Sequence, residues 1–213
     1  DGILAGARKG ALLIDMTTST PTLAKKIAAK AAEKGLQAVD APVSGGDIGA
    51  KNGTLTIMVG GDKTLLSRLQ QLFTPIAASV NYFGPAGSGQ HAKMANQIMI
   101  AGTMTGLTEM LVYAKAAGLD LDETLKVVGG GAGANWSLSN YGPRILQGDY
   151  TPGFFAKHFL KDLRIALDEA DNMHLQLPAT QLAKQLYEQM VNTGKGNLGT
   201  QGLITMNDRW DQA

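Results

Sequence analysis

The chain has 213 residues and 44% of them are hydrophobic, a proportion typical of a globular protein with one large domain or two small ones. Its 19 basic and 18 acidic residues give a formal net charge of +1, so neither nucleic acid nor an anionic membrane surface is an expected partner. The sequence has no cysteine, which excludes disulfides, thiol nucleophiles and zinc-thiolate sites and leads us to expect a cytoplasmic location. No apolar run reaches the roughly 18 to 20 residues that a membrane span needs.

The first part of the chain has the pattern of an α/β protein. The short apolar run at residues 11–15 predicts a buried parallel strand. Thr20 is a typical N-cap, and it predicts a helix that ends at Gly35. A second strand is predicted at residues 37–41. Strand, helix and strand in this order predict a right-handed parallel β-α-β unit.

The strand pattern ends near residue 84, and the rest of the chain is predicted to be helical. The elements expected after the first unit are a strand at 54–59, a helix capped by Asp62, a short strand at 79–83, a long helix at 91–117, a helix that begins at Asp120, and helices at 157–173 and 178–191. Gly102 and Gly106 are four residues apart on the long helix, where we expect that another helix could pack closely. The predicted fold is therefore α/β over residues 1–84, with a parallel sheet, and all-α over 85–213.

The start of the long helix carries one candidate site. Lys93, Asn96 and Gln97 are three and four residues apart, which places them on one helical face. Such a face is more often a solvated helix edge than a site, but its position at the junction of the two parts favours a ligand cleft. The preceding Gly87-Ser88-Gly89 formally begins a dinucleotide fingerprint. We reject that assignment, because the acid expected about 20 residues later falls in the middle of a helix, at Glu109.

The loop after the second strand carries another candidate site. Gly45 and Gly46 expose backbone amides and Ser44 adds a hydroxyl donor, a combination that can hold a carboxylate. The alternative interpretation is an ordinary tight loop that leaves a strand.

Several motifs occur together along the whole chain. They are Asp40-Ala41-Pro42-Val43-Ser44-Gly45-Gly46, Gly49-Ala50, Gly53-Thr54-Leu55, Gly87-Ser88-Gly89 with Lys93 and Asn96, Trp136, Pro143-Arg144, Pro152-Gly153-Phe154 and Lys161-Asp162-Leu163. In this order they resemble the β-hydroxyacid dehydrogenases, a family that includes 3-hydroxyisobutyrate dehydrogenase and tartronate semialdehyde reductase.

The resemblance implies a fold and a reaction. It implies a partial Rossmann-like domain at 1–84 that binds NAD or NADP, and an all-α domain at 85–213, built on a long interdomain helix, that completes the substrate cleft. It also implies reversible oxidation of a small 3-hydroxy acid to its semialdehyde by a homodimer or homotetramer assembled through the α domain. No metal site is expected, since the three histidines show no ligand spacing.

The resemblance also assigns roles to individual residues. Lys93 is the implied catalytic lysine, and it exchanges a proton with the substrate hydroxyl. The implied substrate-binding residues are Ser44, Gly45, Gly46, Asn96 and Gln97. The implied cofactor-binding residues are Thr18, near the nicotinamide ribose, and Lys161. Which of the two carboxamides contacts substrate stays open, because family members often carry asparagine at the fourth position after the lysine and here it is third.

The first half of a Rossmann domain is missing, because no strand-Gly-x-Gly-x-x-Gly-helix precedes Asp15. We therefore expect a truncated form that is inactive by itself. Two alternatives are a relative of 6-phosphogluconate dehydrogenase and a non-catalytic dimerisation or binding module.

Overall fold

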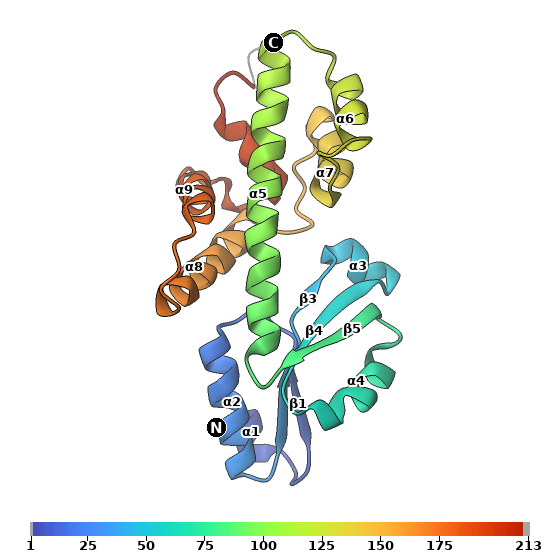
Figure 1. The fold of residues 1–213 in the computed structure, drawn as a ribbon, viewed down its shortest axis with the longest axis vertical. Helices are drawn as coiled ribbons and strands as arrows, with labels where there is room; N and C mark the ends of the chain where they lie inside the picture. The colour runs from blue at the N-terminus through green and yellow to red at the C-terminus, as the bar shows by residue number, and fades with distance from the viewer. Residues whose placement is uncertain (1, 211–213) are drawn as a thin grey trace. The chain divides into compact units, whose positions relative to one another are not determined.

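The computed structural model describes residues 2–210 (Figure 1). The chain divides into two compact units, Asp1–Asn96 and Gln97–Ala213, and the division falls inside the longest helix. In chain order the elements are α1 Ile3–Gly6, β1 Leu12–Asp15, α2 Pro21–Glu33, β2 Gln37–Asp40, β3 Val43–Ser44, α3 Gly46–Asn52, β4 Leu55–Gly60, η1 Lys63–Leu65, α4 Leu66–Phe73, β5 Ala77–Gly84, α5 Ser88–Ala116, α6 Leu121–Gly129, α7 Trp136–Leu146, α8 Ala156–Asn172, α9 Pro178–Asn192, η2 Lys195–Asn197 and η3 Thr200–Met206.

The first unit is a five-stranded sheet with helices on both sides, and α2 and α4 lie on opposite sides of it (Figure 1). β1 pairs in parallel with β2, as the predicted β-α-β unit requires, and β4 pairs in parallel with β5. β4 nevertheless runs antiparallel to β2 and β3, so the sheet is mixed rather than wholly parallel. The reason is the short connection: only α3 separates β3 from β4, and a parallel crossover needs a dozen or more residues.

The prediction that β1 is a buried strand is wrong, because all four of its residues are half-buried. Among the described residues β1 pairs only with β2, so it forms an edge of the sheet. The core of this unit lies instead around β4, where Ile57 and Val59 pack against Leu69 and Phe73 of α4.

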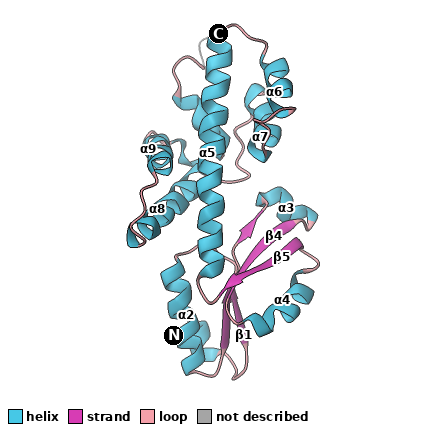
Figure 2. Ribbon diagram, in the orientation of Figure 1, coloured by secondary structure: helices cyan, strands magenta, loops and turns pink. Residues whose placement is uncertain are grey.

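The second unit is helical throughout (Figure 2). Its part of α5 is buried on two faces. Ala101 belongs to a cluster with Phe159, Leu163 and Tyr187 of α8 and α9. A second cluster is formed by Met104, Leu107, Leu111, Leu125, Leu138, Tyr141, Ile145 and Ile204, which joins α5 to α6, α7 and η3. This double burial explains why the sequence of α5 is rich in Ala and Met all around, without a clear polar face. None of the helices in residues 2–210 is long and apolar enough to span a membrane.

The long helices were predicted within a few residues of their ends, but α7 was not predicted. Asn135 caps it by accepting a hydrogen bond from the Leu138 amide at 2.9 Å. Gly142 and Pro143 lie inside it and break the expected helical pattern. The expected close approach at Gly102 and Gly106 is also absent within the described chain, since a Cβ added at either position meets no atom within 4 Å.

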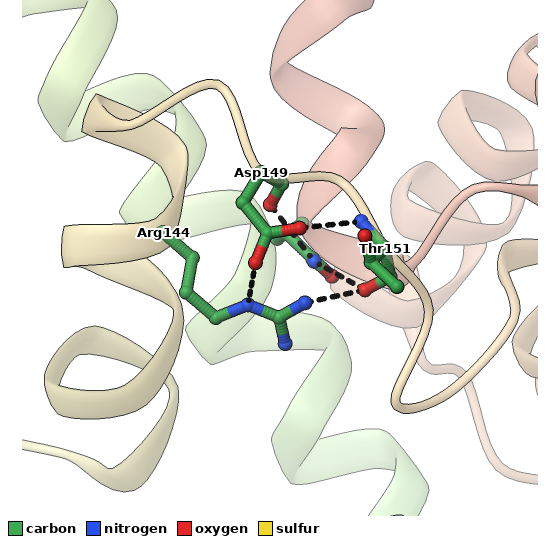
Figure 3. A network of polar contacts seen from close by, with 4 residues as sticks. Arg144, Asp149 and Thr151 are labelled. Atoms are coloured by element: carbon green, nitrogen blue, oxygen red, sulfur yellow. Dashed lines mark hydrogen bonds and ion pairs between the residues drawn. The ribbon is translucent and has the colours of Figure 1, made fainter.

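The end of α7 is held to the following segment by a polar network (Figure 3). Arg144 donates through Nε to Asp149 Oδ2 at 2.8 Å and through Nη2 to the Thr151 carbonyl. The Thr151 amide donates to Asp149 Oδ1 at 2.9 Å, and Gln201 Nε2 donates to the Asp149 and Thr151 carbonyls. Arg144 therefore fixes the turn between α7 and α8 in this structure.

This network makes stability depend on pH. The hydrogen bonds from Arg144 and from the Thr151 amide hold the pKa of Asp149 well below its usual range. A carboxyl group whose pKa is lowered by folding contributes stability above its unfolded pKa of about 4, and this contribution is lost as pH falls through its folded pKa. We expect Asp149→Asn to destabilise the chain at pH 7 and by less at pH 3, as urea unfolding can measure. The exposed Asp168→Asn on α8 is the control, and a destabilisation by Asp149→Asn that is equal at both pH values would contradict this account.

Candidate active site

The N-terminus of α5 packs on two strands, β2 and β4. Asp40, the last residue of β2, is buried, and its two carboxylate oxygens accept hydrogen bonds from the amides of Gly87 and Gln90 at 2.8 and 2.9 Å. Gly89 lies so close to the sheet that an added Cβ would stand 2.4 Å from the Met58 carbonyl oxygen. The first turn of α5 is therefore fixed by a buried carboxylate and by direct packing of backbone on backbone.

This arrangement gives a physical reason to reject the fingerprint at Gly87-Ser88-Gly89 as a phosphate loop. A phosphate at a helix N-terminus needs backbone amides that point toward it. Here Asp40 occupies the amides of Gly87 and Gln90. Gly89 is required for close helix–strand packing.

Lys93 lies one turn into this fixed helix end. Its side chain is buried, with 7% of the residue exposed. Asn96 follows on the same helix, and Ser44 Oγ lies 3.4 Å from Asn96 Oδ1. The structure thus brings together Ser44 and Asn96, which are 52 residues apart in sequence and belong to the two different candidate sites.

Gly45 and Gly46 follow Ser44 directly in the chain. Both are exposed and have positive φ angles of 124° and 64°, in the left-handed region that favours glycine. Leu55 packs against Gly45, since a Cβ added there would stand 3.3 Å from Leu55 Cδ2. The backbone path between β3 and α3 therefore requires glycine at both positions, as in an ordinary tight loop. The same geometry is compatible with carboxylate binding by the loop.

Gln97 and Lys161 meet at Asp162 in the helical unit. Gln97 is fully buried and donates through Nε2 to Asp162 Oδ2 at 2.7 Å. Lys161, whose side chain is half-exposed, forms an ion pair with Asp162 Oδ1 at 2.8 Å. The pair Lys161-Asp162 is thus not simply solvated, because the side chain of Asp162 is only 2% exposed.

The loop between β1 and α2 contains the predicted cofactor residue Thr18. Thr17 donates to Asp15 through its amide and its hydroxyl, and Thr20 caps α2 by accepting from the Leu23 amide. Gln90 of α5 donates to the Thr17 carbonyl at 2.8 Å and accepts from the Ser19 amide at 3.1 Å. Neither Asp40 nor Gln90 was predicted as a functional residue. A buried glutamine near the start of a helix gives no sequence signal of its own.

One buried polar atom of this loop could contact a bound group such as a cofactor. Ser19 Oγ is buried and has no hydrogen-bond partner among the described residues, which is unusual for a polar atom inside a protein. A bound group with a hydrogen-bonding edge would satisfy it. In residues 2–210 no glycine loop follows a strand in the way that a pyrophosphate site requires.

The fold and these residues fit the class of nicotinamide-dependent oxidoreductases, and comparison with known proteins identifies the family. Residues 87–206 match the family model described as NAD-binding of NADP-dependent 3-hydroxyisobutyrate dehydrogenase. Residues 1–84 match the NAD binding domain of 6-phosphogluconate dehydrogenase. The chain belongs to the β-hydroxyacid dehydrogenase family, as the motifs predicted, and the predicted cofactor class of NAD or NADP is confirmed.

Individual relatives cover nearly the whole chain. The uncharacterized oxidoreductase YkwC of Bacillus subtilis is 53% identical over 206 residues, which are 97% of this chain and 72% of that protein. The probable 3-hydroxyisobutyrate dehydrogenase-like 1 of Arabidopsis thaliana is 50% identical over 98% of this chain, and the match spans 62% of its own length. A solved structure of the Mycobacterium tuberculosis 3-hydroxyisobutyrate dehydrogenase with L-serine superposes with a TM-score of 0.87, at 31% identity, over 95% of this chain and 72% of that one.

Proposed function

We propose that the protein of which this chain forms all or part catalyses the reversible NAD(P)-dependent oxidation of a small 3-hydroxy acid to its semialdehyde. The observation that carries the proposal is the grouping around the start of α5. There a buried lysine follows a fixed helix end, and the nearby Asn96 lies 3.4 Å from Ser44 of the glycine loop. A lysine amine, an amide and a hydroxyl with exposed backbone amides match the three needs of the substrate, which are proton transfer, orientation and carboxylate binding.

In the proposed mechanism, Ser44, Gly45 and Gly46 bind the substrate carboxylate, and Asn96 orients the hydroxyl. A bound nicotinamide cofactor would supply the acceptor for the hydride of the carbinol carbon. The hydroxyl proton passes to the Lys93 amine as the carbonyl forms, and Lys93 returns a proton in the reducing direction. Thr18 and Lys161 are the proposed contacts to the cofactor.

Asn96, rather than Gln97, is the proposed substrate contact, because the Gln97 amide is buried and committed to Asp162. We expect Asn96→Ala to raise KM for the hydroxy acid by about tenfold, the effect of losing one polar contact of roughly 1.4 kcal/mol. Gln97→Ala is expected to lower the melting temperature, with a smaller change in KM of the folded enzyme. Steady-state kinetics and thermal melts of both variants test this assignment. The opposite pattern, with KM sensitive to Gln97 and not to Asn96, would make Gln97 the contact.

A substrate panel tests the function itself. The complete gene product that contains this chain is assayed for NADH and NADPH formation with 3-hydroxyisobutyrate, 3-hydroxypropionate, glycerate, 4-hydroxybutyrate, 6-phosphogluconate and L-serine. L-serine is included because it is itself a 3-hydroxy acid and is present in the M. tuberculosis structure. The proposal predicts turnover of at least one small 3-hydroxy acid. Turnover of 6-phosphogluconate alone would favour the phosphogluconate relative, and no turnover at all would favour the non-catalytic module.

Three further proposals accompany this function. The division into domains at residues 84 and 85 is supported by the family models, which match 1–84 and 87–206, whereas the compact units of the structure divide at residues 96 and 97. A homodimer or homotetramer is supported by an exposed stripe on α5 that carries Met99, Gly102, Gly106 and Tyr113. A cytoplasmic location is the third. Light scattering of the wild type beside Gly106→Arg tests the oligomer, and cell fractionation tests the location.

A further inference from the structure

We infer that Gln90 is a positioning residue, which fixes the loop between β1 and α2 that carries Thr18 relative to Lys93. This inference rests on the proposed function and adds to it a residue that touches neither substrate nor cofactor. Gln90 is fully buried, and its amide makes one hydrogen bond through each polar atom, to the Thr17 carbonyl and from the Ser19 amide. Thr18 is the residue between these two contacts, so Gln90 holds the backbone on both sides of it.

Gln90 is itself fixed from the other direction. Its own backbone amide donates to Asp40 Oδ2 at 2.9 Å, and the preceding Gly89 packs directly on the Met58 carbonyl. Lys93 follows three residues later on the same helix, a rise of about 4.5 Å along its axis. Rigid connections therefore run from the sheet to the helix end, from the helix end to Lys93, and through the Gln90 side chain to the loop that carries Thr18.

A buried glutamine of this kind needs an explanation beyond packing. Methionine has nearly the same shape and would fill the same space, but it would leave the Thr17 carbonyl and the Ser19 amide without these hydrogen bonds. The glutamine adds a defined distance and orientation between helix and loop. In proton-coupled hydride transfer this distance matters, because a misplacement of about 1 Å can cost about 100-fold in rate.

Two substitutions separate positioning from packing. Gln90→Met keeps the volume and removes both hydrogen bonds. Gln90→Glu keeps the acceptor for the Ser19 amide but places its second oxygen against the Thr17 carbonyl oxygen. Gln71→Glu, at an exposed position on α4, is the matched control and is expected to behave as the wild type.

The complete gene product carrying each variant is examined in three ways, after circular dichroism has established that it is folded. Amide hydrogen exchange at Ser19 is expected to accelerate in Gln90→Met and not in Gln71→Glu. The dissociation constant for NADH or NADPH, from fluorescence titration, is expected to rise roughly five- to tenfold. The kcat is expected to fall by about 10- to 100-fold while KM for the hydroxy acid changes little. The deuterium isotope effect on kcat with carbinol-deuterated substrate should increase, because the transfer step has become slower.

The outcomes distinguish this inference from the proposed function. Folded Gln90→Met and Gln90→Glu variants that bind cofactor and turn over substrate as the wild type does would overturn the positioning role. A fall in kcat that merely follows the loss of folded protein, with an unchanged isotope effect and cofactor affinity, would also overturn it. If instead Lys93→Ala is as active as the wild type, the proposed function fails. The cofactor affinity of the two Gln90 variants then decides the role of Gln90 by itself.

Discussion

Lys93→Ala is expected to lower kcat for hydroxy-acid oxidation by about 100- to 10,000-fold, the usual contribution of a general acid–base group. The reason is that Lys93 is the proposed proton acceptor for the substrate hydroxyl, and alanine has no titratable group. KM for the hydroxy acid should change much less than kcat, because Ser44, Gly45, Gly46 and Asn96 remain. Steady-state kinetics of the complete gene product measure both constants.

Two control variants sharpen this prediction. Lys93→Arg keeps the positive charge but cannot act as a base, because arginine is not deprotonated in proteins, so it should be nearly as inactive as Lys93→Ala. Lys126→Ala removes an exposed lysine of α6 and should leave kcat unchanged. Activity in Lys93→Arg close to that of the wild type would mean that position 93 supplies charge and not a proton acceptor.

Asp40→Ala is expected to produce the largest loss of stability of the substitutions considered. It removes two hydrogen bonds from a buried carboxylate to the Gly87 and Gln90 amides, and it leaves both amides without their partner. The loss of a helix cap together with buried charge-assisted hydrogen bonds predicts a decrease of about 2 to 4 kcal/mol in the free energy of unfolding. The melting temperature should fall by roughly 5 to 15 °C.

The matched control for Asp40 is Asp120→Ala. Asp120 caps α6 at the surface by accepting from the Glu123 amide, so its loss should cost only about 1 kcal/mol. Asp40→Asn keeps one carbonyl oxygen and should lie between the two. Equal destabilisation by Asp40→Ala and Asp120→Ala in urea unfolding would show that the buried carboxylate does not anchor α5.

Local signals account for the features that the sequence predicted well. Thr20 and Asp120 cap α2 and α6 as expected, because an N-cap acts on amides only a few residues away. The long helix at 91–117 was predicted from its composition. In the structure it begins earlier, at Ser88, because Asp40 at the end of β2 caps it.

Long-range contacts account for what the sequence did not predict. The Asp40 carboxylate and the Gly87 amide are 47 residues apart, and the Gln90 side chain and the Thr17 carbonyl are 73 apart. Neither pairing has a periodicity or a spacing that a single sequence can display. The direction of β4 was missed for a similar reason, since strand length and composition do not specify whether a neighbour runs parallel or antiparallel. The grouping of Ser44 with Lys93 and Asn96 came from the family motifs and not from spacing.

Transfer of deuterium from substrate to cofactor tests the central claim most directly. The complete gene product is incubated with 3-hydroxyisobutyrate, or the best substrate of the panel, deuterated at the carbinol carbon, together with NAD or NADP. The reduced cofactor is then analysed by mass spectrometry. A hydroxy-acid dehydrogenase that uses Lys93 predicts one deuterium in the reduced nicotinamide with the wild type, and little reduced cofactor in the same time with Lys93→Ala. Reduced cofactor without deuterium, or equal yields from both proteins, would contradict the account.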